Sequence, residues 1–290
     1  MMNNEQNPQL TIPRVTSSVF CSDNLELMKT IESNTIDLIY CDILYGTGRN
    51  FGDYQDLKPI RSEIESHYLP RLIEMKRVLK QNGCIYLQMD TRINHWMRIL
   101  MDNVFGYDNF RNEIVWGYNG RQKHSSIRFA NKHDIILFYS KSESHKLNDV
   151  KIEWDRQSRL KTMRRKILID ENGFEYFIDN RGVANGIPKK KVLLLDYLAK
   201  GGSLSDLWVD VSMVIGTDKQ KVDYATQKPK ELISRFVLAS TNEGDLVADF
   251  YLGSGTTAEV CKNLNRNFIG CDINPRAVEI TLQRLNNARS

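Results

Sequence analysis

The chain has 290 residues, of which 41% are apolar and 26% are charged, and its formal net charge is +4. This composition is typical of a globular protein with a sizeable core. No apolar run is long enough for a transmembrane helix, and the polar residues 1–10 differ from a secretory signal. The five cysteines form no CxxC pair. We therefore expect a cytoplasmic protein with reduced cysteines and no metal.

Short β-rich runs alternate with segments of helical periodicity along most of the chain, which predicts an α/β fold with a largely parallel sheet. The predicted strands are residues 18–21, 36–41, 84–89, 134–139, 245–250 and 267–271. The predicted helices are residues 62–83, 228–241 and 256–265. The first helix is expected to end at Gly83. Its predicted apolar stripe consists of Leu69, Leu72, Ile73, Met75 and Leu79.

The decapeptide DILYGTGRNF, residues 42–51, directly follows the second predicted strand. It places a carboxylate, Asp42, three positions before an aromatic ring, Tyr45, and a glycine-rich loop comes next. Two interpretations fit these residues. One is a strand-to-loop turn with a capping aspartate, and the other is a catalytic tip that holds a planar substrate.

The regular alternation stops between about residues 120 and 205, where the sequence is basic and less periodic. Residues 151–200 hold twelve Lys or Arg against seven Asp or Glu. A charge cluster of this kind fits either a solvated face or a phosphate-binding surface. We interpret the region as an inserted or appended subdomain.

The most informative stretch is the GSG turn that follows the predicted strand 245–250. Gly253 and Gly255 permit close backbone approach to a ligand, and the helix start after them offers free N–H groups to its polar end. Asp272 ends the next predicted strand, about 20 residues further on, where a carboxylate can accept hydrogen bonds from both ribose hydroxyls. This combination indicates a nucleoside cofactor.

The identity of that cofactor stays open on these residues alone. With Ala258 in third position, the loop also fits the G-x-G-x-x-G/A pattern of a dinucleotide site. Asp249, directly before the loop, argues against a pyrophosphate and suits the amino group of a zwitterion. Since only one strand and one helix can follow the loop, the rest of its sheet must come from the N-terminal half. The sheet is therefore predicted in circularly permuted order.

Several segments jointly resemble the β-class DNA amino-methyltransferases, which transfer a methyl group from S-adenosylmethionine to an exocyclic amine of adenine or cytosine. DFYLGSGTT and FIGCD are similar to the family's cofactor-loop and ribose-acid motifs. YATQKPKELISRFVLAST is similar to its T-Q-K-P-x-x-L element, which walls the cofactor pocket, and FGYDNFRNEIVWGYN to its central pattern. The order of these segments is also the β-class order.

The resemblance implies a doubly wound, Rossmann-like methyltransferase fold in permuted order, with S-adenosylmethionine as cofactor. The expected parts are a catalytic half in residues 1–118, a target-recognition region in 119–205 and a cofactor-binding half in 206–290. The implied cofactor contacts are Asp23, Gln227, Lys228, Asp249, Phe250, Gly253, Ser254, Gly255, Thr256, Thr257 and Asp272. Helix capping explains Asp23, Thr256 and Thr257 as well.

The family's catalytic tetrapeptide D-P-P-Y stands here as Asp42-Ile43-Leu44-Tyr45, without either proline. By resemblance, Asp42 and the carbonyl of Ile43 accept the N–H groups of the target amine. Tyr45 stacks on the base after it has rotated out of the duplex. Without prolines, the turn must be held by the packing of Ile43 and Leu44. An aspartate at this position favours adenine, since the family's cytosine enzymes usually carry serine there.

We therefore predict a site-specific DNA adenine N6-methyltransferase, from a restriction-modification system or acting alone, with double-stranded DNA as substrate. The predicted phosphate contacts are Arg164, Arg165, Lys189 and Lys190. The resemblance is also compatible with a homodimer and with a cognate restriction endonuclease. The alternatives are cytosine-N4 methylation, a catalytically impaired DNA-binding homologue and an NAD-dependent oxidoreductase.

Overall fold

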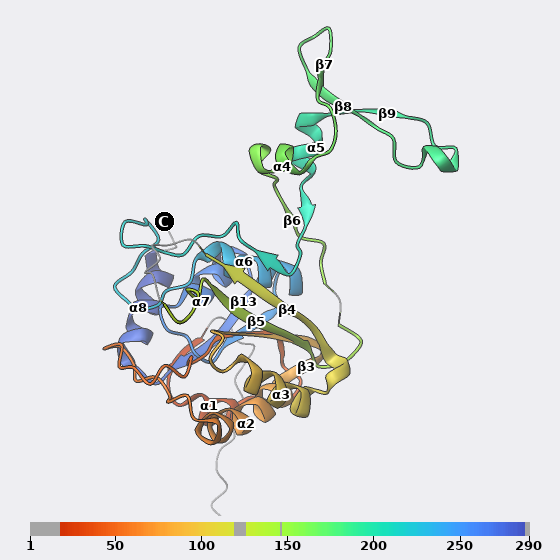
Figure 1. Cartoon of the computed structure of the whole chain (residues 1–290). Coiled ribbons are helices and arrows are strands. Elements are labelled where there is room, and N and C mark those ends of the chain that lie inside the picture. Colours follow the sequence, from red (N-terminus) through yellow and green to blue (C-terminus); the bar gives the residue numbers. More distant parts are fainter. Residues whose placement is uncertain (1–17, 119–125, 146, 288–290) are drawn as a thin grey trace, which may run out of the picture. The chain divides into compact units, whose positions relative to one another are not determined.

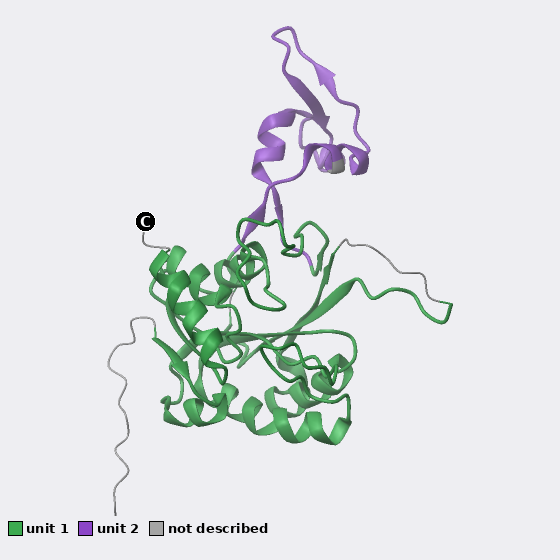
Figure 2. Cartoon of the chain, turned by 90° about the vertical axis from the view of Figure 1, so that its left-hand side faces the viewer, with its two compact units in different colours: residues 1–148, 206–290 green, residues 149–205 purple. Residues whose placement is uncertain are grey.

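The computed structural model describes residues 18–118, 126–145 and 147–287, and the chain divides into two compact units (Figure 2). Unit 1 comprises Met1–Asn148 and Asp206–Ser290, and unit 2 comprises Asp149–Ser205. The predicted target-recognition region begins with residues 119–125, which lie outside the described residues. It also contains a strand of the main sheet before unit 2 starts. Its role in recognition stays a prediction.

Unit 1 is built on an eight-stranded sheet with the order β1-β13-β12-β2-β3-β5-β4-β11 (Figure 1). Only the pairs β3–β5 and β4–β5 of this sheet are antiparallel. Its strands are β1 Ser18–Cys21, β2 Ile36–Asp42, β3 Leu79–Met89, β4 Phe110–Gly117, β5 His133–Ser140, β11 Leu207–Trp208, β12 Leu246–Asp249 and β13 Asn267–Asp272. Because β12, late in the chain, pairs with β2, the predicted largely parallel sheet in permuted order is confirmed.

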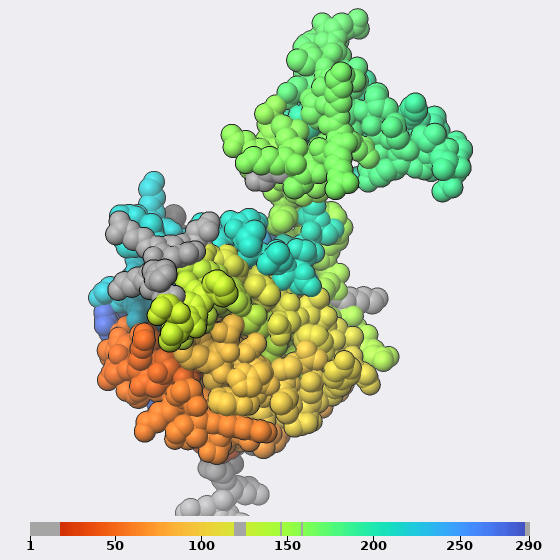
Figure 3. Space-filling model, viewed as in Figure 1, coloured from red at the N-terminus to blue at the C-terminus, as the bar shows by residue number. Residues whose placement is uncertain are grey.

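Helices cover both faces of this sheet, with α1 to α3 on one face and α6 to α8 on the other (Figure 1). Their bounds are α1 Asn24–Thr30, α2 Arg61–Val78, α3 Asn94–Phe105, α6 Lys230–Ser240, α7 Thr256–Asn263 and α8 Pro275–Asn287, with a 3-10 turn, η1, at Tyr107–Asn109. Covering both faces explains why the central strands are near-continuous apolar runs. In the space-filling view, the segments from α2 to β4 form a continuous surface of unit 1 (Figure 3). Among the described helices, none has the length and apolar character to span a bilayer.

The predicted helix 62–83 is wrong in its last part. Helix α2 ends at Val78 and β3 begins at Leu79, so Gly83 lies inside a strand. A Cβ at position 83 would come within 3.0 Å of the Asp37 carbonyl oxygen, on the neighbouring strand β2. This glycine is therefore explained by close backbone approach rather than by a helix end.

The predicted apolar stripe of α2 is also partly wrong. Leu69 and Ile73 are exposed, by 40% and 52%. The buried residues of the helix are Ile64, Tyr68, Leu72, Met75 and Val78. These positions follow the mixed i+4 and i+3 spacing of one helix face, whereas the predicted set included residues from a neighbouring face.

Unit 2 is a small body with a three-stranded antiparallel sheet, β7-β8-β9, and two short helices. Its elements are β6 Lys151–Ile152, α4 Arg156–Thr162, β7 Leu168–Ile169, β8 Glu175–Asp179, the 3-10 turn η2 Val183–Asn185, β9 Lys190–Leu193, α5 Leu194–Lys200 and β10 Gly202–Ser203. Phe177 and Leu194 are buried at its centre. The antiparallel pair β6–β10 brings the entering and leaving chain of unit 2 side by side.

Candidate active site

The parallel strands β2 and β12 are neighbours at the point where successive strands run to opposite sides of the sheet. Ligands of open α/β folds bind at such a switch point, beyond the carboxyl ends of the strands. Asp42 ends β2 and Asp249 ends β12. A cavity of about 390 Å³ opens here, and it is lined by Asp42 and Tyr45 as well as by Gly253 and Asp272. The structure thus brings the predicted tip and the predicted cofactor loop into one cavity.

Asp42 belongs to a polar network in the wall of this cavity. Its Oδ2 lies 2.5 Å from Nζ of Lys228, and its Oδ1 lies 2.8 Å from the Tyr45 hydroxyl, within hydrogen-bond distance. Both partners are largely shielded, since the Asp42 side chain is 22% exposed and that of Lys228 is 10% exposed. Burial raises the pKa of the Asp42 carboxyl, and the Lys228 ammonium opposes this rise. Lys228, which we predicted in the cofactor wall, therefore contacts the predicted catalytic tip.

A second carboxylate, Asp134 on β5, lies behind Tyr45. Its Oδ2 is 2.7 Å from the Tyr45 hydroxyl and accepts a further hydrogen bond from Gln88 at 2.8 Å. Its Oδ1 accepts from the Tyr118 hydroxyl at 3.1 Å. We did not predict Asp134 or Gln88 from the sequence. The position of Gln88, a polar residue inside an apolar strand, could have indicated a functional role. Asp134 stands near a strand start, where polar residues are common, and its position gives no such indication.

The tip is held by hydrogen bonds as well as by packing, although both prolines are absent. Ile43 is 3% exposed, and its N–H donates to a carbonyl of β3 at 3.1 Å. The carbonyl of Leu44 accepts from the Tyr68 hydroxyl at 2.9 Å. Asp56 accepts from two backbone N–H groups of the following loop, at 3.1 and 2.7 Å. Packing of Ile43 and Leu44 is thus only part of what fixes the turn.

The glycine loop has the geometry that its sequence indicates. Gly253 and Gly255 have φ angles of +52° and +74°, a region that favours glycine. A Cβ at Gly255 would also collide with Thr281 on α8. The Gly253 N–H donates to Oδ2 of Asp272 at 2.9 Å, which places this carboxylate beside the loop at the cavity wall.

Asp249 is a buried carboxylate, 2% exposed. It accepts hydrogen bonds from the Thr257 hydroxyl at 2.6 Å and from the Tyr251 N–H at 3.0 Å. Within the described part of the chain, no ion pair balances its charge, and burial raises its pKa to about 7. It lines a small pocket of about 40 Å³ together with Lys228 and Gly253. A ligand ammonium would supply the missing positive charge.

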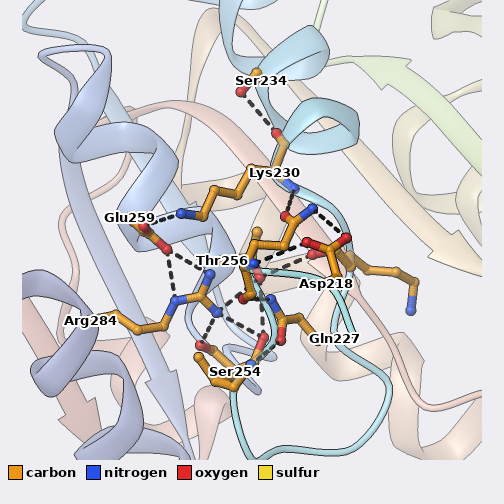
Figure 4. A network of polar contacts seen from close by, with 11 residues as sticks. Asp218, Gln227, Lys230, Ser234, Ser254, Thr256, Glu259 and Arg284 are labelled. Carbon is orange, nitrogen blue, oxygen red and sulfur yellow. Dashed lines mark hydrogen bonds and ion pairs between the residues drawn. The ribbon is translucent and has the colours of Figure 1, made fainter. Parts of the chain in front are cut away.

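Other residues support the glycine loop from behind (Figure 4). Arg284 of α8 donates to the Ser254 carbonyl at 2.7 Å and pairs with Glu259, which also pairs with Lys230. The Thr256 hydroxyl donates to the Lys228 carbonyl at 3.2 Å. This network ties the loop to the segment of the T-Q-K-P motif and to the last helix.

Two of the predicted cofactor contacts differ in their surroundings, since Gln227 is engaged within the protein and Phe250 lines the cavity. Gln227 bonds inside its own loop, because its side chain accepts from the Val222 N–H and donates to the Gln220 carbonyl. Phe250 is 1% exposed and contributes to the cavity wall. The capping alternative for the loop threonines is wrong, since the N-cap residue of α7 is Gly255.

Asp23 does cap a helix. It is the N-cap residue of α1, and its carboxylate accepts from the Leu25 N–H at 2.8 Å. It also pairs with Arg71 at 2.8 Å, and both side chains line the cavity. His67 lies nearby, and burial lowers its pKa to about 4, which keeps the ring neutral. Contact of Asp23 with a cofactor stays a prediction.

The loop after the tip lines the cavity, and Asp53 within it is bound to two other segments. The rings of Phe51 and Tyr54 stack with centroids 5.1 Å apart and line the cavity. Between them, the Asp53 carboxylate accepts from the Ala225 N–H at 3.0 Å and pairs with Arg276 at 2.8 Å. These contacts link the tip loop to the segment before α6 and to the start of α8.

The four predicted phosphate contacts differ in their surroundings. Arg164, Lys189 and Lys190 are exposed on unit 2. Arg165 pairs instead with Asp179 at 3.0 Å, and its guanidinium lies over the Phe177 ring, 5.0 Å from the centroid. Three of the four are thus free to meet a ligand at the surface, whereas Arg165 also stabilises the unit. No cluster of residues suited to a metal ion occurs in the part of the chain that the structure describes.

An open doubly wound sheet, a glycine loop beside an acid, and a polar tip in the same cavity define an α/β enzyme with a nucleoside cofactor. Comparison with known proteins identifies the family. A DNA methylase family model, N6_N4_Mtase, matches residues 36–283. The chain is also 32% identical over 272 residues to the type II methyltransferase M.HpaI of Haemophilus parainfluenzae, which covers 93% of this chain and 74% of that protein. The chain therefore belongs to the N6/N4 DNA methylase family.

Further relatives agree with this assignment. The DNA adenine methyltransferase YhdJ of Escherichia coli strain K12 is 26% identical over 277 residues, which covers 93% of this chain and 83% of that protein. Among solved structures, the PvuII DNA methyltransferase, named as cytosine-N4-specific, superposes with a TM-score of 0.61 at 17% identity, over 94% of this chain and 88% of that one. A complex of M1.HpyAVI with SAM superposes with a TM-score of 0.58 at 18% identity, over 92% and 98%. These structural likenesses confirm the fold.

Family membership confirms the resemblance that the motifs indicated, and it removes the NAD-dependent alternative. The chain is a DNA methyltransferase with S-adenosylmethionine as cofactor. The residues present fit this molecule. In their predicted roles, Asp249 would receive its ammonium group in the small pocket, and Asp272 would receive its ribose hydroxyls in the cavity.

Proposed function

We propose that the chain methylates N6 of adenine in double-stranded DNA at a specific sequence, within a restriction-modification system or as a solitary enzyme. The observation that carries this proposal is the position of Asp42. Its carboxylate is paired with Lys228 and lies in the same cavity as Gly253 and Asp272. A base rotated out of the duplex would meet an anionic acceptor next to the methyl donor.

The proposed chemistry increases the nucleophilicity of the target amine. An exocyclic amine is a poor nucleophile, because its lone pair is delocalised into the ring. Asp42 and the carbonyl of Ile43 would accept its N–H groups and favour a tetrahedral nitrogen, which frees the lone pair. The bound cofactor supplies an electrophilic methyl group on a sulfonium. The Lys228 ammonium favours the ionised form of Asp42, and this carboxylate would take up the proton that the methylated nitrogen releases.

Aromatic residues of the cavity are proposed to hold the base. Tyr45, Phe51 and Tyr54 all line it. Stacking of a base on such a ring contributes about 1–3 kcal/mol. The Tyr45 hydroxyl is engaged by carboxylates at one edge of the ring, which leaves stacking to its faces.

Adenine is proposed over cytosine because the tip begins with aspartate. The similarity to an enzyme named as an adenine methyltransferase over 93% of the chain supports this choice. The match to an enzyme named as cytosine-N4-specific, at 17% identity, concerns the fold alone. Methylation of cytosine N4 is the alternative outcome that the experiment below distinguishes.

Methyl transfer from labelled S-adenosylmethionine to mixed-sequence duplex DNA tests the function, with the modified bases then mapped by position. We expect label in N6-methyladenine within one sequence context. Asp42→Ala should lower the rate at least about 100-fold while cofactor affinity is retained. Asp108→Ala, an exposed aspartate in η1 outside the cavity, is the matched control and should leave the rate unchanged.

Each other outcome contradicts a stated part of the proposal. Label in N4-methylcytosine would replace the target base. Absence of label, with cofactor and duplex still bound, would show a catalytically impaired protein. If Asp42→Ala abolished cofactor binding and transfer persisted, the role given to Asp42 would be wrong.

Unit 2 is proposed to contact the DNA backbone around the target. Its exposed Arg164, Lys189 and Lys190 support this role. A homodimer and a cognate endonuclease stay predictions from the family resemblance.

A further inference from the structure

The hydroxyl of Tyr45 has one proton and two carboxylate neighbours. Asp134 Oδ2 lies 2.7 Å from it and Asp42 Oδ1 lies 2.8 Å from it. A tyrosine hydroxyl donates a single hydrogen bond. Only one of the two carboxylates can therefore accept the hydrogen bond from Tyr45 at a time. This choice decides whether Oδ1 of Asp42 is available to a substrate.

The surroundings of the two carboxylates are unequal. Asp42 has the ammonium of Lys228 at 2.5 Å. Asp134 is 4% exposed, and no cation lies within ion-pair distance of it among the residues that the structure describes. Asp134 is stabilised by hydroxyl and amide donors, without an ion pair. The loss of one hydrogen-bond donor is therefore more unfavourable for Asp134 than for Asp42.

The other donors to Asp134 are themselves fixed. The amide of Gln88 donates to Asp134 at 2.8 Å, and its oxygen accepts from the Tyr40 hydroxyl at 2.7 Å, so the amide is held at both ends. Tyr40 is 1% exposed and Gln88 is fully buried. Asp134 is thus a rigid acceptor behind the tip, and it does not line the cavity itself.

We propose that Asp134 is a positioning residue for methyl transfer, because it holds the Tyr45 proton and so leaves Oδ1 of Asp42 to accept the target amine. The same contact fixes the Tyr45 ring in the cavity wall, a constraint that the tip needs in the absence of its two prolines. This inference rests on the proposed function of Asp42. It assigns to β5, which carries none of the catalytic motif, a part in orienting the reacting groups.

The substitution Asp134→Asn tests the proposal in two backgrounds. In the wild-type background, the Tyr45 hydroxyl should then donate its hydrogen bond to Asp42. We expect kcat to fall about 10- to 100-fold and the cofactor affinity to stay unchanged. Tyr45→Phe removes the proton, so adding Asp134→Asn to Tyr45→Phe should lower kcat no further. An equal loss of kcat in both backgrounds, or a loss of cofactor affinity, would overturn the proposal.

A matched control separates positioning from general destabilisation. Asp102 on α3 accepts a hydrogen bond from the Tyr139 hydroxyl at 2.6 Å, in the same unit but outside the cavity. Asp102→Asn removes a comparable tyrosine–carboxylate contact and should leave kcat unchanged. If it lowered kcat as much as Asp134→Asn does, the effect would be structural and the proposal wrong.

An NMR measurement tests the role of Asp134 independently of the proposed function. With tyrosines labelled by carbon-13 at Cζ, the Tyr45 resonance is the one missing from Tyr45→Phe. It should move more in Asp134→Asn than in Asp42→Asn, and the reverse order would overturn the assignment of the proton. If the wild type methylates no DNA, the proposed function fails, while this comparison still decides whether Asp134 holds Tyr45.

Discussion

At the scale of single residues, Lys228 sets the electrostatics of the site. Its ammonium lies 2.5 Å from Asp42 and also 5.2 Å from the centroid of the Tyr45 ring. Removing one partner of a shielded ion pair leaves the other charge uncompensated, which is strongly unfavourable. The ion pair therefore opposes the rise in the Asp42 pKa that burial causes, and it favours the ionised carboxylate.

Lys228→Met should therefore displace the pH dependence of methyl transfer. Without the ammonium, the pKa of Asp42 rises further, so a larger fraction of this carboxyl is protonated at pH 7. We expect kcat at pH 7 to fall and to recover partly as the pH rises, with the profile shifted to higher pH than in the wild type. Lys80→Met, which removes an ion pair with Asp37 outside the cavity, is the control. An unshifted profile for Lys228→Met would contradict the role of the ion pair.

Asp249 predicts a pH-dependent cofactor affinity. Its pKa of about 7 means that much of this carboxyl is protonated below pH 7 in the free protein. A bound ammonium favours the ionised form, so binding should release a proton, and affinity should increase as the pH rises from about 6 to about 8. Calorimetry in buffers of different ionisation enthalpy measures the proton release. Asp249→Asn should abolish it, and proton release that persists in this variant would assign the effect elsewhere.

At the scale of elements, the loop after the tip forms part of the cavity wall, and we refer to it as the strap. Asp53 in this loop is held by Arg276, which also pairs with Asp223 at 2.5 Å. Because Arg276 is 49% exposed, each ion pair contributes at most about 1 kcal/mol. The ion pairs of Arg276 are thus weak, and the hydrogen bond from the Ala225 N–H also holds Asp53. We predict that the strap opens when the cofactor exchanges.

Arg276→Ala should speed the dissociation of S-adenosylmethionine by up to about fivefold, the factor that corresponds to about 1 kcal/mol. Stopped-flow measurement of cofactor release checks this. Arg61→Ala, which removes an exposed ion pair with Glu65 on α2, is the matched control and should leave the rate of release unchanged. Equal rates for Arg276→Ala and the wild type would show that the strap does not limit release.

The elements also show what the sequence could predict. The central strands and the glycine loop were predictable, since buried strands are short apolar runs and Gly255 has a φ angle that favours glycine. Gly83 was misread because its reason, close approach to β2, depends on the pairing of distant strands. Asp134 was missed for a similar reason, since only the antiparallel pairing of β5 with β3 brings it to the tip.

At the scale of the whole molecule, the site depends on strands from both ends of the chain. β2 carries Asp42, β12 carries Asp249, and the two strands pair within one sheet. The permuted order thus joins the two predicted halves in one compact unit, because neither half alone completes the sheet or the cavity. The chain enters unit 2 through β6 and leaves it through β10, and these two strands form an antiparallel pair.

This division between the units predicts how DNA affinity depends on salt. Each phosphate contact that a basic residue makes contributes about 0.9 to the slope of log affinity against log salt concentration. The double variant Lys189→Ala with Lys190→Ala should therefore bind duplex more weakly and reduce the slope by about 2, while cofactor affinity is retained.

Two further variants sharpen this prediction, with fluorescence anisotropy of a labelled duplex across a salt series as the measurement. Lys29→Ala removes an exposed charge on α1 and should leave the slope unchanged. Arg165→Ala should instead lower the melting temperature of unit 2, because Arg165 pairs with Asp179 and packs on Phe177. Removing lysines that contact DNA phosphates reduces the number of counterions released on binding, and so reduces the salt slope. An unchanged salt slope in the double lysine variant would therefore mean that other residues bind the DNA backbone.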